Sequence, residues 1–473
     1  MGSNRVKKNS GITLIALVIT IIVMLILVAV TISMAVNGGL FEYAGKAVGD
    51  TNNAIKAEQD LGSGKISIDN KLYNSIDEYL ETKGGAGGSG GTGGSGDVLP
   101  TYTNANKEDG YLIQKATYSD GVEEKPAIIP EGYKVVNDGE KIANGIVIAD
   151  NNGNEFVWIP VEKAIVTEAE IAAIKAEDNT ITTDVKAVEK LVRSGTFPMA
   201  VQDGENYKGL LYNFKGTDTL TEETTVYDWT NASYKEPANL TGSITWSSAT
   251  IVNGTTLTGG TSYVYDSQDM FTLYGVGTYS DTLYQEAYNK MVESVAENGG
   301  FYVGRYEISS GTYILPDGST VKYSQSKPNQ TALVSTEWYN IYKYERDYAK
   351  YNTNLGVTSE MIWGTQWDQM MLFVNGKNDG ATTPAKFYVT TAGSRNSGAE
   401  STKTGMNTVD QVANIFDLEA SRYEWTQETY GYVARVCHGG FYNGSSSSQR
   451  SSFSTTSNYD YVSSRAALYI TNE

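Results

Sequence analysis

Residues 414–470 carry the pattern that most constrains the fold of this chain. A tight turn at Gly439 and Gly440 is followed by 24 residues, 441–464, which include ten Ser, three Tyr and two Asn. A continuous apolar run resumes only in the final segment, AALYI at 466–470. Binding loops use such residues, because Tyr gives contact area at a low entropy cost while Ser and Asn adapt their hydrogen bonds. The pattern predicts a buried terminal strand on a rigid base that presents a polar, tyrosine-bearing surface.

Length and charge narrow the possibilities. A chain of 473 residues suggests two or three structural units, and 40% hydrophobic residues are enough for a core. The net charge of −19 argues against nucleic-acid binding, which requires a basic face. Cys437 is the only cysteine, so the chain cannot form an internal disulfide.

Near the N-terminus, residues 12–36 form a run of 25 without a charged side chain. A helix needs only about 20 apolar residues to cross a bilayer. Arg5, Lys7 and Lys8 precede the run and should stay cytoplasmic, so that the C-terminal part is extracellular. A cleavable secretory signal fits less well, because its apolar region has only about 7–15 residues. We therefore expect a transmembrane helix over 12–36.

The same region, KNSGITLIAL at 8–17, resembles the type IV prepilin motif G-F-T-L-I-E-L. The resemblance implies that a membrane peptidase cuts between Gly11 and Ile12, so that residues 1–11 form a leader. Ala16 stands where pilins usually carry the glutamate that pairs subunits in the filament. This departure argues against a major pilin. The alternatives are a minor pilin that associates with pilus components, or a protein simply held in the membrane.

A stalk and a linker are predicted next. Residues 37–83 show short helical patterns, one of them beginning at Leu72. Residues 84–97 contain GGAGGSGGTGGSG, whose composition is that of a flexible coil with a span of about 20 Å. The folded domain is then 98–473, with an insertion of loops and short strands at about 204–268.

Local patterns within that domain predict an α+β fold. Two β-branched runs around an Asp-Asn-Asn-Gly turn predict a hairpin over 145–161. Apolar residues at a spacing of three to four predict helices, over 280–297, 335–348 and 358–374. The aromatic and methionine side chains of the last helix are expected in the core. Helices beside a mostly antiparallel sheet make an α+β arrangement.

Several short motifs resemble, in the same order, those of formylglycine-generating-enzyme-like domains. They are GFYVGRYE at 300–307, LVSTEWY at 333–339, WGTQWDQM at 363–370, DLEAS at 417–421, YEWT at 423–426, RVCHGGF at 435–441 and Arg465 with Ala466. That family has a C-type-lectin-like fold, so the resemblance implies this fold for 98–473. Glu424 and Trp425 are expected to have structural roles. The carboxylate of Glu424 should have hydrogen-bond partners, and the ring of Trp425 should be buried.

The catalytic centres of that family have no counterpart here. Oxygen-using members need a pair of cysteines that hold copper, and this chain has only Cys437, which we expect to be a small buried hydrophobe. Iron-dependent relatives need several histidines, and His438 is the only one here. We expect no enzyme activity, no catalytic residues and no cofactor; a degenerate oxidoreductase is the alternative. Oxygen-bearing side chains in the loops of 375–417 leave room for a structural Ca²⁺.

In position and composition, the polar C-terminal segment resembles the variable region of retroelement-diversified proteins, which share this fold. Adenine-directed mutagenesis leaves Asn, Ser, Tyr, Thr, Asp and Gly at their exposed positions. The resemblance implies a ligand-binding region at 441–465; an ordinary Ser-rich surface loop is the alternative. The residues expected to contact the ligand are Tyr442, Asn443, Ser445, Ser447, Ser451, Phe453, Ser454, Thr455, Asn458, Tyr459, Asp460 and Tyr461.

These expectations combine into one functional hypothesis. The chain is predicted to be a cell-surface, adhesin-like or receptor-like protein, anchored by residues 12–36. Its partner is an extracellular protein or glycan and not a nucleic acid.

Overall fold

The computed structural model describes most of the chain between residues 110 and 471. The gaps in that part are 124, 214–224, 227–232, 237–241, 353–355, 375–402, 407–410, 419–421, 432–433 and 440–449. Before residue 110, the described residues are 66–68, 71–73, 101–103 and 107–108.

The chain divides into two compact units, Met1–Ser95 and Gly96–Glu473. In the first, β1 (Ile66–Ile68) and β2 (Lys71–Tyr73) form an antiparallel hairpin. The short helix predicted from Leu72 is therefore wrong at its start, because Leu72 and Tyr73 pair with the preceding strand as part of β2.

Most of the predicted N-terminal features lie outside the described residues. They are the leader with its cleavage site between Gly11 and Ile12, the membrane segment at 12–36 and the linker at 84–97. In the part of the chain that the structure describes, no helix is both long and apolar enough to span a membrane.

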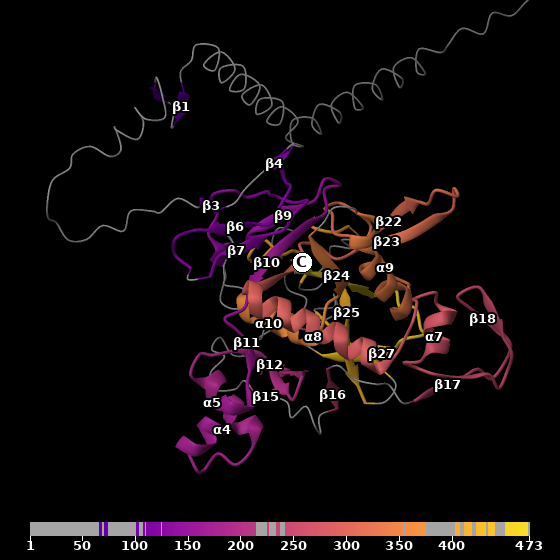
Figure 1. The fold of residues 1–473 in the computed structure, drawn as a ribbon. Coiled ribbons are helices and arrows are strands. Elements are labelled where there is room, and N and C mark those ends of the chain that lie inside the picture. The colour runs from indigo at the N-terminus through magenta and orange to yellow at the C-terminus, as the bar shows by residue number, and fades with distance from the viewer. Residues whose placement is uncertain are drawn as a thin grey trace, which may run out of the picture. The chain divides into compact units, whose positions relative to one another are not determined.

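The second unit is built around an antiparallel six-stranded sheet with the order β24-β29-β21-β10-β9-β8 (Figure 1). Its strands are β8 (Lys134–Val135), β9 (Val147–Ala149), β10 (Glu155–Pro160), β21 (Gly300–Gly304), β24 (Val357–Met361) and β29 (Ala466–Ile470). The predicted hairpin at 145–161 is confirmed by the pairing of β9 with β10. The predicted terminal strand is also confirmed, since all of β29 is buried between β21 and β24.

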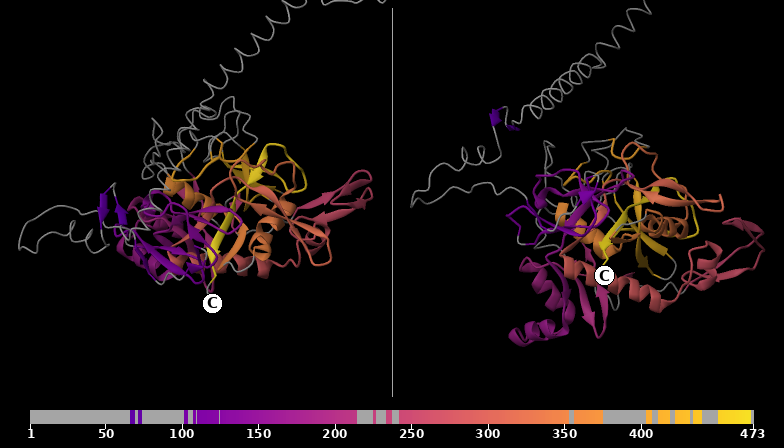
Figure 2. Two further views of the ribbon diagram at one scale, coloured as in Figure 1. Left: turned by 90° about the horizontal axis from the view of Figure 1, so that it is seen from above. Right: turned by 45° about the horizontal axis from the view of Figure 1, so that its top comes forward.

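Gly300 shows why these strands approach so closely. A Cβ atom at this position would stand 2.4 Å from Cζ2 of Trp158 and 2.5 Å from the carbonyl oxygen of Ile159. Only glycine leaves room for the tryptophan ring at the start of β21. Figure 2 shows the yellow C-terminal strand running beside the purple and orange strands of this sheet.

A second sheet carries most of the remaining C-terminal strands. Its order is β16-β25-β26-β27, and β28 pairs with β25 in parallel. The strands are β16 (Tyr234–Lys235), β25 (Tyr423–Tyr430), β26 (Ala434–His438), β27 (Ser451–Ser454) and β28 (Val462–Ser464). Since β28 leads directly into β29, the last residues connect the two sheets.

Helix α8 (Asp281–Asn298) confirms the prediction over 280–297. Ser280 caps its first turn by accepting a hydrogen bond from the backbone N–H of Leu283, at 3.1 Å. Gly299 ends the helix in the left-handed conformation, with φ of 76°. The helix packs against β29 and β21, and so covers the six-stranded sheet.

Two other helices differ from prediction at their starts. Helix α9 (Trp338–Tyr351) begins after residue 335, because Ser335 has a positive φ of 52° that a right-handed helix cannot include. The predicted helix over 358–374 is wrong in its first part, since Val357–Met361 is the edge strand β24 and α10 covers Gly364–Val374. A buried strand and a helix follow each other here almost without a break, and apolar spacing does not separate them.

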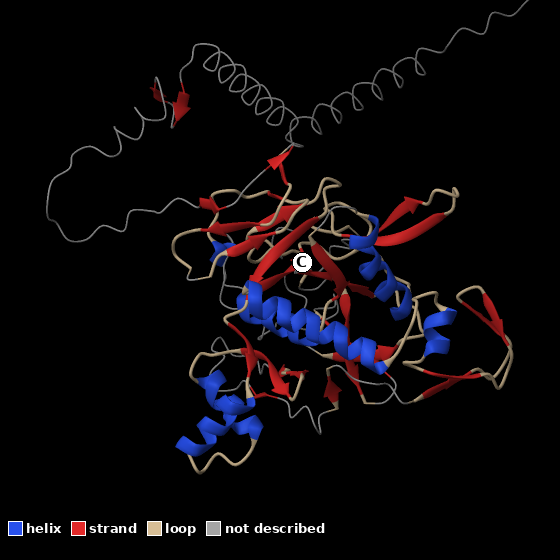
Figure 3. Cartoon of the chain, in the orientation of Figure 1, coloured by secondary structure: helices blue, strands red, loops and turns tan. Residues whose placement is uncertain are grey.

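The expected core position of the aromatic and methionine side chains over 363–373 is confirmed except for Phe373, which is half-buried against the core. Trp363, Trp367, Met370 and Met371 are all fully buried. The combination of helices with mostly antiparallel strands confirms the α+β class (Figure 3).

The remaining elements lie around these sheets. Helices α4 and α5 pack on each other beside β12, while the short strands β17 and β20 pair near α7. Within 204–268, the described residues form short strands and loops, as predicted. The bounds of these elements are β3 (Thr101–Thr103), β4 (Lys107–Glu108), β5 (Tyr111–Leu112), β6 (Ala116–Ser119), β7 (Ala127–Ile129), η1 (Ile142–Asn144), β11 (Lys163–Val166), α4 (Glu168–Glu177), α5 (Asp184–Arg193), β12 (Pro198–Asp203), β13 (Asn206–Gly209), β14 (Tyr212–Asn213), β15 (Thr225–Val226), β17 (Ser243–Thr245), β18 (Thr250–Val252), β19 (Thr255–Leu257), β20 (Ser262–Val264), α7 (Gln268–Leu273), β22 (Ser309–Ile314) and β23 (Thr320–Gln325).

Candidate binding surface

An aromatic cluster forms where β27 and the loop at 455–461 meet β25. It consists of Tyr423, Trp425, Phe453, Tyr459 and Tyr461. The ring centroids of Phe453 and Tyr459 are 4.9 Å apart, and those of Tyr459 and Tyr461 are 5.4 Å apart. Trp425 lies 6.1 Å from Phe453, edge to face. Separations of about 4.5–7 Å are favourable for aromatic pairs, so the rings stabilise one another.

The register of the second sheet explains this clustering. Trp425 pairs with Cys437, and Cys437 pairs with Ser451. Residues directly opposite in a sheet share a face, as do alternate residues along one strand. Phe453, two residues after Ser451, therefore lies on the same face as Trp425.

Exposure increases from the base of the aromatic cluster to its top. Trp425 is fully buried and Tyr423 is only 8% exposed, whereas Phe453, Tyr459 and Tyr461 are half-buried. Burial raises the pKa of the Tyr461 hydroxyl above its usual value. The cluster thus offers solvent-accessible ring area above a packed, rigid floor.

Polar predicted residues surround these rings. Asn458 and Asp460 are exposed, while Ser451 and Ser454 are half-buried. The hydroxyl of Ser454 lies 3.1 Å from that of Thr456. The loop itself is held by its backbone, since the carbonyl of Tyr459 accepts a hydrogen bond of 2.7 Å from the N–H of Ser335.

One predicted contact residue needs correction, and four cannot be placed. Thr455 is fully buried beside Tyr339 on α9, so its side chain is not exposed to a ligand. Tyr442, Asn443, Ser445 and Ser447 lie outside the described residues.

Arg465 anchors the C-terminal end of the segment 451–464, which we call the display segment. Its guanidinium is fully buried and donates to both oxygens of Glu424, at 2.9 and 2.7 Å. It also donates to the carbonyl oxygens of Gly304 and Phe416, at 2.7 and 2.8 Å. The expected structural role of Glu424 and Trp425 is confirmed, since both are buried and the carboxylate is paired.

Arg450 anchors the other end of the display segment. It donates to Glu428 at 3.1 Å, to the carbonyl oxygen of Tyr212 at 2.6 Å and to Asp368 on α10. Its side chain is only 6% exposed. The display segment is therefore fixed at both ends by buried arginines, each of which links it to distant parts of the chain.

A third buried arginine holds β26, the strand that pairs with β27. Arg435 on β26 donates to both oxygens of Asp266, at 2.7 and 2.8 Å, and to the hydroxyl of Tyr284 at 2.9 Å. Its guanidinium also lies 4.2 Å from the ring centroid of Trp338. Because buried charges of this kind require fixed partners, β26 cannot shift without breaking them.

Further carboxyl groups gather around the Arg450 anchor. Glu236 accepts hydrogen bonds from the backbone N–H groups of Gly364 and Thr365, where α10 begins. Burial, reinforced by the neighbouring Glu428, raises the pKa of Glu236 to about 8. Burial, opposed by Arg450, raises the pKa of Glu428 to about 7. Glu236 is thus mostly protonated at neutral pH.

Cys437 and His438 both lie in the buried strand β26. Burial raises the pKa of the Cys437 thiol well above its usual value, so the thiol is a small buried hydrophobe, as expected. Burial also lowers the pKa of His438 far below its usual value, and its Nε2 lies 3.0 Å from Glu428. In the described parts of the chain, no group of three or more His, Cys, Asp or Glu side chains could hold a metal ion.

Sequence reasoning missed most residues that shape this surface. Tyr423 belongs to the aromatic cluster, although it lies well before the polar segment. The partners of the arginine anchors are far away in sequence, such as Asp266 for Arg435 and Asp368 for Arg450. A usable signal existed, because single arginines within apolar or Ser-rich strands imply a buried carboxylate elsewhere.

Comparison with known proteins found no match among family models, curated proteins or solved structures.

Proposed function

We propose that this chain is a cell-surface binding protein whose display segment holds an extracellular protein ligand. The observation that carries the proposal is the half-exposed aromatic cluster on a segment fixed at both ends by buried arginines. Tyr side chains dominate the energetics of protein interfaces, because they bury a large area with few rotatable bonds. A rigid support favours binding, because little order must be created when the ligand arrives.

Two further proposals belong to this function. The first is a C-type-lectin-like fold for the second unit, supported by the pairing of β21 with the terminal strand β29 and by the two helices α9 and α10. The second is anchorage by residues 12–36, supported by their length without a charge.

Diversification by a retroelement is also part of the proposal. It is supported by the separation of roles within the display segment, where Asn458 and Asp460 are exposed while Thr455 and Val462 are buried. Changes at exposed positions would alter the surface and leave the arginine anchors intact. Sequencing the flanking DNA tests this point. We expect a reverse-transcriptase gene and a near-copy of the segment encoding 441–465 that differs at adenines; DNA without either contradicts it.

The binding proposal is tested with the full chain in detergent micelles. It is screened against purified extracellular proteins and against a glycan array, and we expect a protein ligand. Tyr459→Ala and Tyr461→Ala should each weaken its binding about 30-fold, the effect of losing about 2 kcal/mol at an interface hot spot.

Tyr313→Ala is the matched control. Tyr313 lies on β22, is 37% exposed and stacks on Tyr351 at 5.0 Å, so it resembles the cluster tyrosines but lies outside the display segment. Its removal should leave binding unchanged. Wild-type affinity in both cluster variants would remove this surface from the site, and binding to glycans alone would contradict the choice of a protein ligand.

A further inference from the structure

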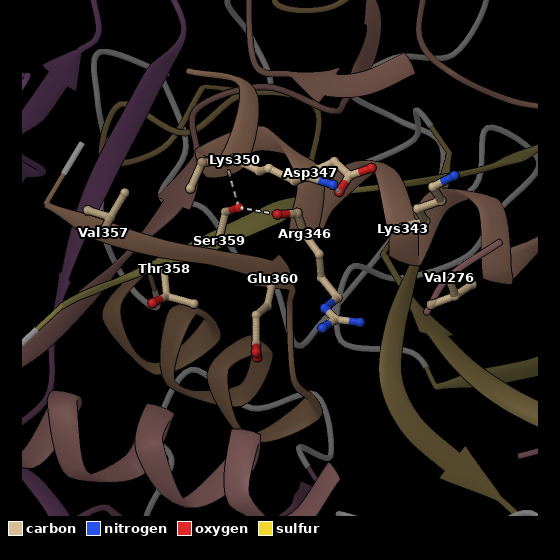
Figure 4. Close-up of a pocket in the computed structure, with 10 residues that line it drawn as sticks. Val276, Lys343, Arg346, Asp347, Lys350, Val357, Thr358, Ser359 and Glu360 are labelled. Carbon is tan, nitrogen blue, oxygen red and sulfur yellow. Dashed lines mark hydrogen bonds and ion pairs between the residues drawn. The ribbon is translucent and has the colours of Figure 1, made fainter. Parts of the chain in front are cut away.

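A cavity of about 400 Å³ lies between helix α9 and the edge strand β24, with Val276 at one side (Figure 4). Cavities of about 300–1,000 Å³ are the size that small ligands occupy. None of the lining residues belongs to the aromatic cluster or the display segment. The cavity therefore has to be explained separately from the proposed protein-binding surface.

Basic side chains dominate the wall that α9 contributes. Lys343, Arg346 and Lys350 are spaced by three and four residues, so they share one face of the helix. Lys350 has a partner, because its Nζ lies 3.7 Å from Oδ1 of Asp347. This local excess of positive charge stands out in a chain with a net charge of −19.

Arg346 is the notable member of this group. Its guanidinium lies 5.1 Å from the ring centroid of Tyr342, which fixes its plane. Within the described residues, the side-chain nitrogens of Arg346 and Lys343 take part in no hydrogen bond or ion pair. An arginine guanidinium offers five N–H donors in a planar fork that matches carboxylate and phosphate oxygens.

Glu360 on β24 supplies a polar group of a different kind. It is only 7% exposed, and one of its oxygens accepts a hydrogen bond of 3.0 Å from Nε1 of Trp363. Burial, opposed by Arg346, raises the pKa of Glu360 to about 7. Near neutral pH this carboxyl group can accept a hydrogen bond or donate one. Figure 4 shows Arg346 and Glu360 extending to the same side of the cavity, from α9 and β24 respectively.

We propose that this cavity binds a small sugar acid or sugar phosphate, a molecule that combines an oxyanion with hydroxyl groups. The guanidinium of Arg346 pairs with the oxyanion. The carboxyl group of Glu360 hydrogen-bonds a hydroxyl group of the sugar. A simple anion can pair with Arg346 but offers no sugar hydroxyl group to Glu360. A neutral sugar can hydrogen-bond Glu360 but brings no oxyanion to Arg346.

Isothermal titration of the full chain in detergent micelles tests the proposal with four probes: glucuronate, glucose 6-phosphate, glucose and inorganic phosphate. We expect the two charged sugars to bind about tenfold or more tightly than glucose and inorganic phosphate, because a hydrogen bond to a charged group is worth that much. Comparing glucuronate with glucose 6-phosphate shows whether the cavity prefers a carboxylate or a phosphate as the oxyanion.

Three variants sharpen the test. Arg346→Gln should weaken binding of both charged sugars about tenfold or more, and Glu360→Gln should weaken the sugars but not inorganic phosphate. Arg193→Gln, at an exposed arginine at the end of α5, is the matched control and should bind like wild type. Equal binding of glucose and glucuronate, no binding of either charged sugar, or wild-type binding by Arg346→Gln would each overturn the proposal.

Discussion

Replacing Arg465 by methionine is expected to lower the free energy of unfolding of the second unit by about 3–5 kcal/mol. The guanidinium donates four hydrogen bonds of 2.7 to 2.9 Å, two to Glu424 and two to backbone carbonyl oxygens. Methionine fills much of the space but donates none of them. The carboxylate of Glu424 would then be buried without a counter-charge, and the two carbonyl oxygens would lose their donor.

The cost should depend on pH in a defined direction. Burial raises the pKa of Glu424 to about 7, and Arg465 is what opposes a larger rise. Without the arginine this pKa rises further, so the folded variant must keep Glu424 protonated. Keeping a proton becomes harder as pH increases. The destabilisation by Arg465→Met is therefore expected to be larger at pH 8 than at pH 6.

Urea unfolding of residues 96–473, followed by tryptophan fluorescence, measures both effects. The double variant Arg465→Met with Glu424→Leu should recover most of the lost stability, because replacing a whole buried ion pair by apolar side chains is often neutral. Lys208→Met is the matched control, since Lys208 and Asp203 form an exposed pair at 2.7 Å that should contribute only about 0–1 kcal/mol. A loss below about 1 kcal/mol for Arg465→Met, or no recovery in the double variant, would refute the reasoning.

Two further predictions concern the stability of the same unit. Burial raises the pKa of Asp368 to about 6, of Glu360 to about 7 and of Glu236 to about 8, so the folded state holds protons that the unfolded chain releases above about pH 4.5. The thermal midpoint of the second unit should therefore fall as pH rises from 5 to 8, and Glu236→Gln should make this fall smaller. His438 acts in the opposite direction, because its lowered pKa favours the folded state as pH rises. A midpoint that rises over this range contradicts these pKa assignments. Gly145→Ala should cost about 2 kcal/mol or more, because Gly145 has φ of 88° and a Cβ would stand 2.2 Å from the carbonyl oxygen of Ala413. Gly153→Ala, with φ of 78° but open space around it, should cost only about 1 kcal/mol, and equal urea midpoints for the two variants would show that the close contact is unimportant.

Local patterns predicted the elements whose signals are contained within a short stretch. The hairpin at 145–161 combines β-branched runs with a turn, and helix 280–297 has an N-cap, a regular apolar face and a terminal glycine. Prediction failed where the partner is distant. The residues at 357–361 form a strand because β29, more than 100 residues later, pairs with them.

By itself, the sequence determined that the chain ends in a buried apolar strand preceded by a polar, tyrosine-bearing segment, because these properties depend on residue type and spacing alone. Only the tertiary structure decided which of the polar residues face solvent, and it showed that Thr455 is buried. It also decided which carboxylates pair with the three arginines. The physical reason is that burial and ion pairing arise between segments brought together by the two sheets, and local sequence carries little record of such distant neighbours.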